Sequence, residues 1–120
     1  MSLKFETLRH ANAIRWREWD GSKVLNLMYL AVQLGGEVGE LLNLIKKLER
    51  ERLGLRGSRT TVADIGNELA DVVICADLVA QKLGLSLSVL VRDKFNETSR
   101  KVGLKTLLPP AVESEKPHDP

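Results

Sequence analysis

The residue types in this chain that are best suited to chemistry form two acidic pairs, Glu37 with Glu40 and Glu68 with Asp71. Each pair has i, i+3 spacing and lies in a strongly apolar stretch whose periodicity indicates a helix. Taking a carboxylate out of water costs free energy unless a cation, a proton or a hydrogen-bond donor compensates its charge. Two such pairs in similar settings therefore predict a bound cation.

A helical wheel at about 100° per residue places the two pairs at matching positions. In each pair the first acid lies about 60° and the second about 120° to one side of the apolar stripe. We therefore expect Glu37 and Glu68 to be more deeply buried than Glu40 and Asp71. If the two helices pack with these edges facing, all four carboxylates converge. Two solvated helix faces are the alternative, because most single acidic pairs are solvated.

The all-oxygen character of this cluster predicts which metal it would bind. Carboxylate oxygens suit Mg²⁺ or Mn²⁺. Di-iron bundles also use inward glutamates, but they add Glu-x-x-His motifs, and the only histidines here are His10 and His118. Mg²⁺ with open coordination positions typically binds substrate phosphates and activates water. We therefore expect Mg²⁺, with Mn²⁺ as a possible substitute, and a phosphate-bearing substrate.

Three further side chains are candidates for contacts with such a substrate. Lys47 lies on the same side of its helix as Glu40, two turns along, where it can meet a phosphate or simply pair with nearby acids. Lys94 falls on the inward stripe of its predicted helix, so it needs a partner unless it snorkels to water. Trp16 is a candidate for an apolar slot in the substrate site, with core packing as the alternative.

The remaining pattern indicates an all-α domain, a four- to five-helix bundle. Helical periodicity predicts helices over residues 3–19, 23–50, 62–83 and 87–102. From the second helix onward, the expected N-caps are Ser22, Thr61 and Ser86. On the first helix, the inner side is expected to carry Phe5, Leu8, Asn12, Trp16 and Trp19. We expect one domain over residues 1–104 and an extended, disordered tail over the proline-rich residues 105–120.

Composition supports one helical domain and excludes several classes of function. The 120 residues are 43% hydrophobic and only 4% aromatic, which favours helices packed on helices. With 18 basic and 16 acidic residues, the charge is too balanced for a nucleic-acid-binding surface. No apolar run reaches the roughly 20 residues that a membrane helix needs. Cys75 is the only cysteine, which is typical of a reducing compartment, so we expect a cytoplasmic protein that binds neither nucleic acid nor membrane.

A family resemblance rests on four segments in order, namely Gly36-Glu37-Val38-Gly39-Glu40-Leu41, Glu68-Leu69-Ala70-Asp71-Val72-Val73, Leu83-Gly84-Leu85 and Lys94-Phe95-Asn96. From about Phe5 to Leu104 the chain resembles the MazG-like nucleotide pyrophosphohydrolases. This all-α superfamily includes dCTP pyrophosphatases, dimeric dUTPases and phosphoribosyl-ATP pyrophosphatases. Gly36 stands where many members have an acid, a departure that recurs in the dCTP-pyrophosphatase-like branch.

The resemblance implies specific roles for the residues of these segments. It implies that the two acidic pairs bind Mg²⁺ and that a nucleoside triphosphate is cleaved between its α and β phosphates. Lys94 and Asn96 match the stretch that contacts phosphate and sugar. It also implies a homodimer or homotetramer, in line with a second helix that presents more apolar surface than its neighbours cover.

The expected function is therefore Mg²⁺-dependent hydrolysis of canonical, deoxy or modified nucleoside triphosphates to the monophosphate and pyrophosphate. Glu37 or Glu40 is expected to accept the proton of the attacking water. Phosphoribosyl-ATP pyrophosphatase is the nearest alternative. A non-catalytic helical module for dimerisation or nucleotide sensing is an alternative from another class. The base preference stays open.

Overall fold

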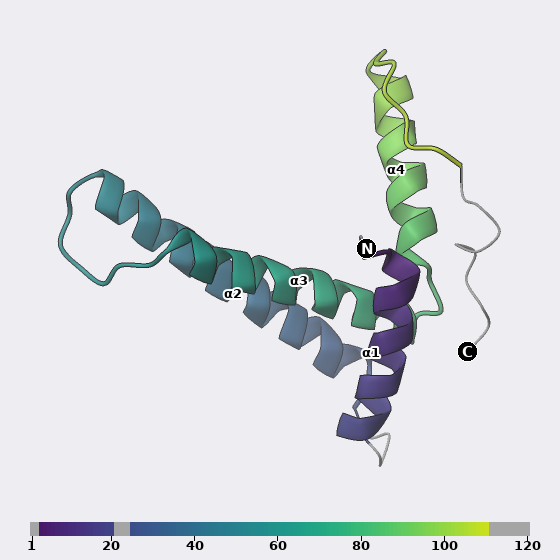
Figure 1. Ribbon diagram of the computed structural model, residues 1–120, viewed down its shortest axis with the longest axis horizontal. Coiled ribbons are helices and arrows are strands. Elements are labelled where there is room, and N and C mark those ends of the chain that lie inside the picture. The colour runs from purple at the N-terminus through teal and green to yellow at the C-terminus, as the bar shows by residue number, and fades with distance from the viewer. Residues whose placement is uncertain (1–2, 21–24, 111–120) are drawn as a thin grey trace.

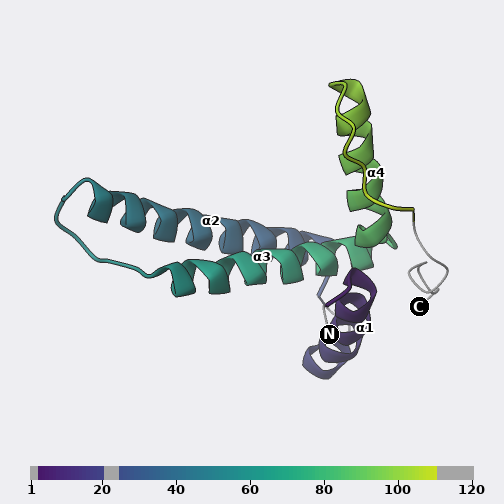
Figure 2. The same ribbon diagram turned by 45° about the horizontal axis from the view of Figure 1, so that its top comes forward.

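The computed structural model describes residues 3–20 and 25–110, and these form four α-helices with no strand. The helices are α1 (Phe5–Trp19), α2 (Leu27–Arg52), α3 (Val62–Lys82) and α4 (Leu87–Lys101). Helices α2 and α3 lie side by side as a long antiparallel hairpin (Figure 1). Helix α1 crosses the end of that hairpin, and α4 projects away from it (Figure 2). The predicted all-α class is confirmed.

Side-chain caps define the starts of α3 and α4 as predicted. Thr61 Oγ1 accepts a hydrogen bond from the backbone N–H of Asp64 at 3.1 Å, and Ser86 Oγ accepts from Val89 at 3.4 Å. Each bond satisfies a backbone donor that has no partner inside its helix. The predicted closing glycine of α3, Gly84, adopts φ 70°, a left-handed conformation that glycine tolerates.

The start of α2 differs from the prediction. We expected the helix to begin at Lys23, but Leu25 and Asn26 are not helical. Asn26 Oδ1 accepts from the backbone N–H of Tyr29 at 3.0 Å and so acts as the N-cap. Asparagine is among the strongest N-capping residues, so this local bond explains the later start. The predicted cap Ser22 lies outside the described residues.

A buried polar network joins α1 to α3. The side chain of Asp77 is 1% exposed, and its carboxylate lies 3.0 to 3.2 Å from the guanidinium nitrogens of Arg9. Asn12 Nδ2 donates to Asp77 at 2.9 Å and to the carbonyl of Ile74 at 3.3 Å. Asn12 thus lies on the inner side of α1 as predicted. The same prediction is wrong for Trp19, which is 73% exposed at the last turn of α1.

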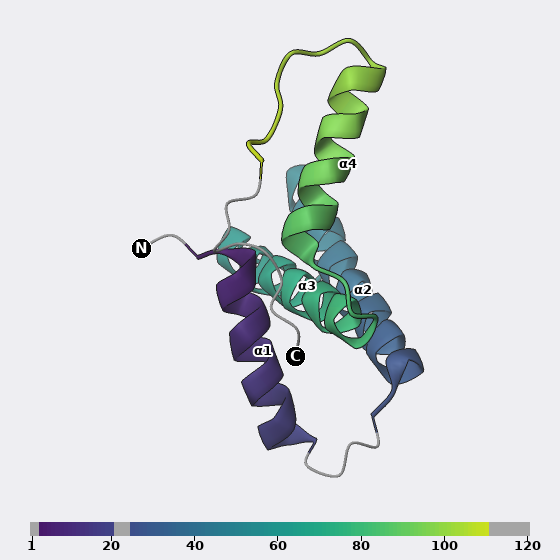
Figure 3. The same ribbon diagram turned by 90° about the vertical axis from the view of Figure 1, so that its right-hand side faces the viewer.

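Helix α4 does not complete a bundle within the protomer. The chain bends by 105° between α3 and α4, and α4 extends from its contact with α1 (Figure 3). Its apolar side chains Val91 and Phe95 remain exposed. The expected four- to five-helix bundle is therefore present only in part. No single helix in the described ranges is long and apolar enough to cross a membrane.

The segment that follows α4 is held against it. Asn96 Oδ1 accepts from the backbone N–H of Leu108 at 2.7 Å, and Asn96 Nδ2 donates to the Leu108 carbonyl at 3.1 Å. Arg92 Nε donates to the carbonyl of Pro109. Leu108 and Pro109 of the predicted tail are therefore bonded to α4, and residues 111–120 are outside the described part of the chain.

Candidate metal centre

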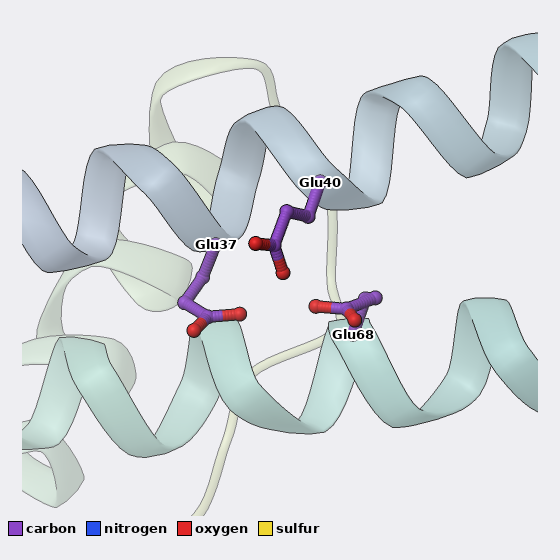
Figure 4. Close-up of side chains that lie close together, drawn as sticks. All are labelled: Glu37, Glu40 and Glu68. Atoms are coloured by element: carbon purple, nitrogen blue, oxygen red, sulfur yellow. The ribbon is translucent and has the colours of Figure 1, made fainter.

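Three of the four predicted carboxylates meet along the α2–α3 hairpin. Glu37 and Glu40 project from α2 toward α3, and Glu68 projects from α3 toward α2 (Figure 4). One oxygen from each side chain lies within 4.8 Å of the others. The i, i+3 spacing puts the two α2 acids on one face, so both can face the same point on α3. We call Glu37, Glu40 and Glu68 the carboxylate cluster.

Burial within the carboxylate cluster follows the order expected from the helical wheel. Glu37 and Glu68 are half-buried, whereas Glu40 is exposed. One oxygen of Glu37 and one of Glu68 are buried and lack a hydrogen-bond partner. An unpartnered buried carboxylate oxygen is costly, so each needs a proton or a cation. These orphaned oxygens, in an all-oxygen set, fit a hard divalent cation such as Mg²⁺.

The electrostatics of Glu68 also reflect this shortage of partners. Burial is the largest cause that raises the pKa of Glu68 to about 7, from an ordinary value of 4.5. Hydrogen bonds from the protonated form to Glu37 and Glu40 raise the pKa of Glu68 further, and the negative charges of those two carboxylates add to the effect. The cluster therefore holds a proton near neutral pH, at a position where a metal ion can replace it.

Asp71 lies one helical turn beyond Glu68, is exposed, and is not part of the carboxylate cluster. The negative charge of Asp71 and that of Glu37 both act on the thiol of Cys75, which lies further along α3. Burial chiefly raises the pKa of the Cys75 thiol, and the charges of Glu37 and Asp71 raise it further. Arg15 of α1 acts in the opposite direction. Asp71 is therefore near Cys75 and one helical turn from the metal-ligand candidate Glu68.

Lys47 follows Glu40 by seven residues, which is about 10 Å along α2 and on the same helix face. The side chain is half-buried, and no ion pair of Lys47 occurs among the described residues. Its ammonium group therefore has no acidic partner in the described part of the chain and lies on the same face of α2 as Glu40.

The candidates on α4 lie elsewhere in the protomer. The expectation of an inward Lys94 is wrong, because its side chain is 74% exposed and its Nζ lies 3.6 Å from Glu97. The stripe that contains Lys94 has no covering helix in the protomer, so the charge stays in water. Glu68 is about 20 Å along α3 from the end of that helix, and α4 then turns away. Asn96 binds the segment after α4 instead of approaching the cluster.

Trp16 is half-buried and lines a pocket of about 280 Å³ where α1 meets the hairpin. The pocket walls include Leu30 of α2 together with Leu78, Gln81 and Lys82 of α3. We call this cavity the α1 pocket. The sequence prediction included Trp16 but missed Gln81.

The sequence prediction also missed the pairing of Arg9 with Asp77. Asp77 is the only charged residue in the run Val72-Val73-Ile74-Cys75-Ala76-Asp77-Leu78-Val79-Ala80. This single charge in an apolar run could have indicated a buried ion pair. A carboxylate in such a run needs a partner when it is buried. The identity of that partner depends on how α1 crosses α3, which no local pattern specifies.

Comparisons of the chain with protein-family models, with characterised proteins and with solved structures gave no match.

Proposed function

We propose that this protein is a Mg²⁺-dependent nucleoside triphosphate pyrophosphohydrolase of the MazG-like kind. The observation that supports this most strongly is the carboxylate cluster, in which Glu37 and Glu68 each carry a buried oxygen without a partner. Ordinary solvated helix faces do not bury unpartnered carboxylate oxygens. The order and spacing of the two acidic motifs, which resemble that superfamily, support the same activity.

Glu37, Glu40 and Glu68 would hold the metal, and Asp71 would add a fourth carboxylate by turning its exposed side chain toward them. When bound, Mg²⁺ neutralises phosphate charge and lowers the pKa of a coordinated water. The half-buried pair, Glu37 and Glu68, would anchor the site from opposite helices. The two exposed acids, Glu40 and Asp71, would face the entering triphosphate and its waters.

Glu40 is our candidate for the general base because it is the exposed member of the carboxylate cluster, and the attacking water arrives from solvent. The water oxygen forms a bond to the α phosphorus, and its proton passes to the Glu40 carboxylate. The bond from the α phosphorus to the bridging oxygen breaks, and pyrophosphate leaves with that oxygen. Lys47 stabilises the charge that develops on the outer phosphates.

We further propose that the functional unit is a homodimer or homotetramer. Met28 and Leu42 on α2 are 69% and 59% exposed, and the apolar side of α4 has no cover. The radius of gyration is 17.5 Å, against about 14 Å for a compact domain of this length. A second copy can bury these surfaces. Lys94 would then serve a substrate across that interface, because α4 turns away from the cluster of its own chain. Asn96 would do so only by releasing its two bonds to Leu108.

A product assay tests the proposed activity. The protein is incubated with Mg²⁺ and a panel of canonical, deoxy and modified triphosphates plus phosphoribosyl-ATP, and the products are separated by chromatography. Monophosphate with pyrophosphate supports the proposal, and diphosphate with phosphate contradicts it. Turnover of phosphoribosyl-ATP alone would indicate the alternative function, a phosphoribosyl-ATP pyrophosphatase.

Three variants connect the activity to the carboxylate cluster. Glu37→Gln and Glu68→Gln should abolish turnover and weaken Mn²⁺ binding, measured by calorimetry. Glu51→Gln is the matched control, because Glu51 is an exposed acid on α2 outside the cluster. If no substrate turns over and neither cluster variant changes metal binding, the protein is a non-catalytic helical module.

A further inference from the structure

Positive charge in this chain is concentrated at the end of the α2–α3 hairpin that lies away from α1 and α4 (Figure 1 and Figure 2). Residues 46–59 span the last turns of α2 and most of the loop to α3, and we call them the hairpin tip. They contain six basic and two acidic residues, which gives +4, whereas the rest of the chain contains 12 basic and 14 acidic residues, which gives −2. The nearly balanced charge of the whole chain therefore conceals a strongly basic projection.

Three arginines of the hairpin tip, Arg50, Arg56 and Arg59, have no acidic partner among the described residues. Arg50 Nη1 donates to the carbonyl of Ser58 at 3.2 Å, and Arg59 Nη2 donates to the carbonyl of Leu55 at 2.7 Å. These neutral partners hold the loop but do not compensate the charge of either guanidinium. A guanidinium has five N–H donors, so most of them remain available to an anion outside the protein.

Two leucines at the turn of the hairpin tip, Leu53 and Leu55, are each 55% exposed. The N–H of Leu55 donates to the carbonyl of Arg50, and the N–H of Gly54, at φ 70°, donates to the carbonyl of Glu51, both at 3.0 Å. These two bonds form a Schellman ending, which usually packs the residue at the position of Leu55 against an apolar side chain of the last helical turn. The facing position here is Arg50, so Leu55 stays in water.

An anionic lipid surface matches both features of the hairpin tip. Lipid phosphates pair with arginines, and the acyl boundary beneath them accepts apolar side chains that project from the protein. A nucleic acid would pair with the arginines but leave the two leucines in water. Residues 46–59 also contain no aromatic side chain on which a base could stack. The combination of charge and exposed leucines therefore favours a bilayer.

We propose that the hairpin tip docks this protein on an anionic lipid bilayer, with Leu53 and Leu55 at the acyl boundary and the arginines at the lipid phosphates. This inference is independent of the proposed function. We expected no membrane binding because no segment is long enough to span a bilayer and the total charge is balanced, but a peripheral contact requires neither. Each basic residue held near an anionic surface strengthens binding about fivefold.

Flotation of the full-length protein with vesicles tests this docking. One set of vesicles contains phosphatidylcholine alone, and the other contains phosphatidylcholine and phosphatidylserine in equal parts. The protein should float only with the second set. Raising the salt from about 0.15 M to about 1 M shortens the Debye length from about 8 Å to about 3 Å and should release most of the protein. Equal flotation with both sets, or flotation with neither, would overturn the proposal.

Single substitutions show whether the hairpin tip makes the contact. Arg56→Ala and Leu55→Ser should each lower the partition coefficient for phosphatidylserine vesicles at least about fivefold. Lys101→Ala and Leu104→Ser are the matched controls, because both residues are exposed at the far end of α4, and they should leave partition unchanged. Unchanged partition in Arg56→Ala and Leu55→Ser, or an equal loss in the controls, would contradict docking through the hairpin tip.

Two further measurements distinguish a bilayer from other partners. If duplex DNA displaces the protein from vesicles and Leu55→Ser binds that DNA as tightly as the unchanged protein, the partner is a nucleic acid and the proposal is wrong. Light scattering reports the oligomeric state. If Leu55→Ser reduces that state without reducing flotation, the leucines belong to a contact between copies of the chain, which also overturns the proposal.

Discussion

Replacement of Arg9 by methionine should destabilise the protein more than any other single change in the network between α1 and α3. Arg9→Met keeps most of the aliphatic stem but removes the three guanidinium contacts to Asp77, which span 3.0 to 3.2 Å. Asp77 is then left 1% exposed with Asn12 as its remaining side-chain donor. Leaving a buried charge without its partner costs about 3–5 kcal/mol.

Replacement of Asp77, the other member of the pair, by asparagine should cost less stability than Arg9→Met. Asp77→Asn retains an acceptor for Asn12, and the Arg9 side chain is 25% exposed, so its guanidinium can turn toward water. We expect a loss of about 1–3 kcal/mol. Replacing both residues with apolar ones, Arg9→Met with Asp77→Leu, should cost less than the sum of the separate Arg9→Met and Asp77→Leu losses, because the pair interacts directly.

Urea unfolding followed by far-ultraviolet circular dichroism measures these differences. All variants are compared at one protein concentration, since assembly makes stability depend on concentration. Arg17→Met is the matched control, because Arg17 is exposed on α1 and, among the described residues, bonds only the carbonyl of Ala13 within that helix. It should change stability by less than about 0.5 kcal/mol. If Arg9→Met costs no more than Asp77→Asn or Arg17→Met, the buried pair does not hold α1 on α3.

Four other predictions concern Glu68, Gly57, Gly35 and Asn96. In chelator-treated protein, the raised pKa of Glu68 adds stability that is fully present below about pH 4.5 and is lost as the pH rises to about 7. The thermal midpoint should therefore fall over this pH range, and Glu68→Gln should abolish that pH dependence. Gly57→Ala should cost about 1–3 kcal/mol in urea unfolding, because Gly57 has φ 136°, a conformation that a residue with a Cβ adopts only with strain. Gly35→Ala, with open space inside α2, should instead stabilise by about 0.5–1 kcal/mol. Asn96→Ala should increase amide exchange at Leu108, because it removes both bonds that hold that residue to α4, and unchanged exchange would show that other contacts hold the segment.

The features that were predictable from sequence are those set by neighbours along the chain. Thr61 and Ser86 cap their helices through bonds to residues three positions later, so the local pattern was sufficient. The convergence of Glu37 with Glu68 follows from helical periodicity once α2 and α3 pair. The start of α2 was misplaced because Asn26 offers a competing cap that the periodicity did not distinguish.

The features that were missed depend on contacts distant in sequence. Arg9 and Asp77 are 68 residues apart, and their pairing requires the particular crossing of α1 over α3. The wheel placed Lys94 on the apolar stripe of α4, but whether a stripe is buried depends on a covering helix. Because α4 turns away from the hairpin, that stripe is uncovered and Lys94 remains in solvent.

Hydrolysis in ¹⁸O-labelled water tests the central claim most directly. The protein is incubated with Mg²⁺ and each triphosphate of the panel, and the products are analysed by mass spectrometry. The proposed attack on the α phosphorus predicts pyrophosphate without label and a monophosphate that carries ¹⁸O. This reaction should be absent in Glu37→Gln and retained in Glu51→Gln. Label in inorganic phosphate together with a nucleoside diphosphate, or equal turnover in Glu37→Gln, would contradict the assignment of the carboxylate cluster to pyrophosphohydrolysis.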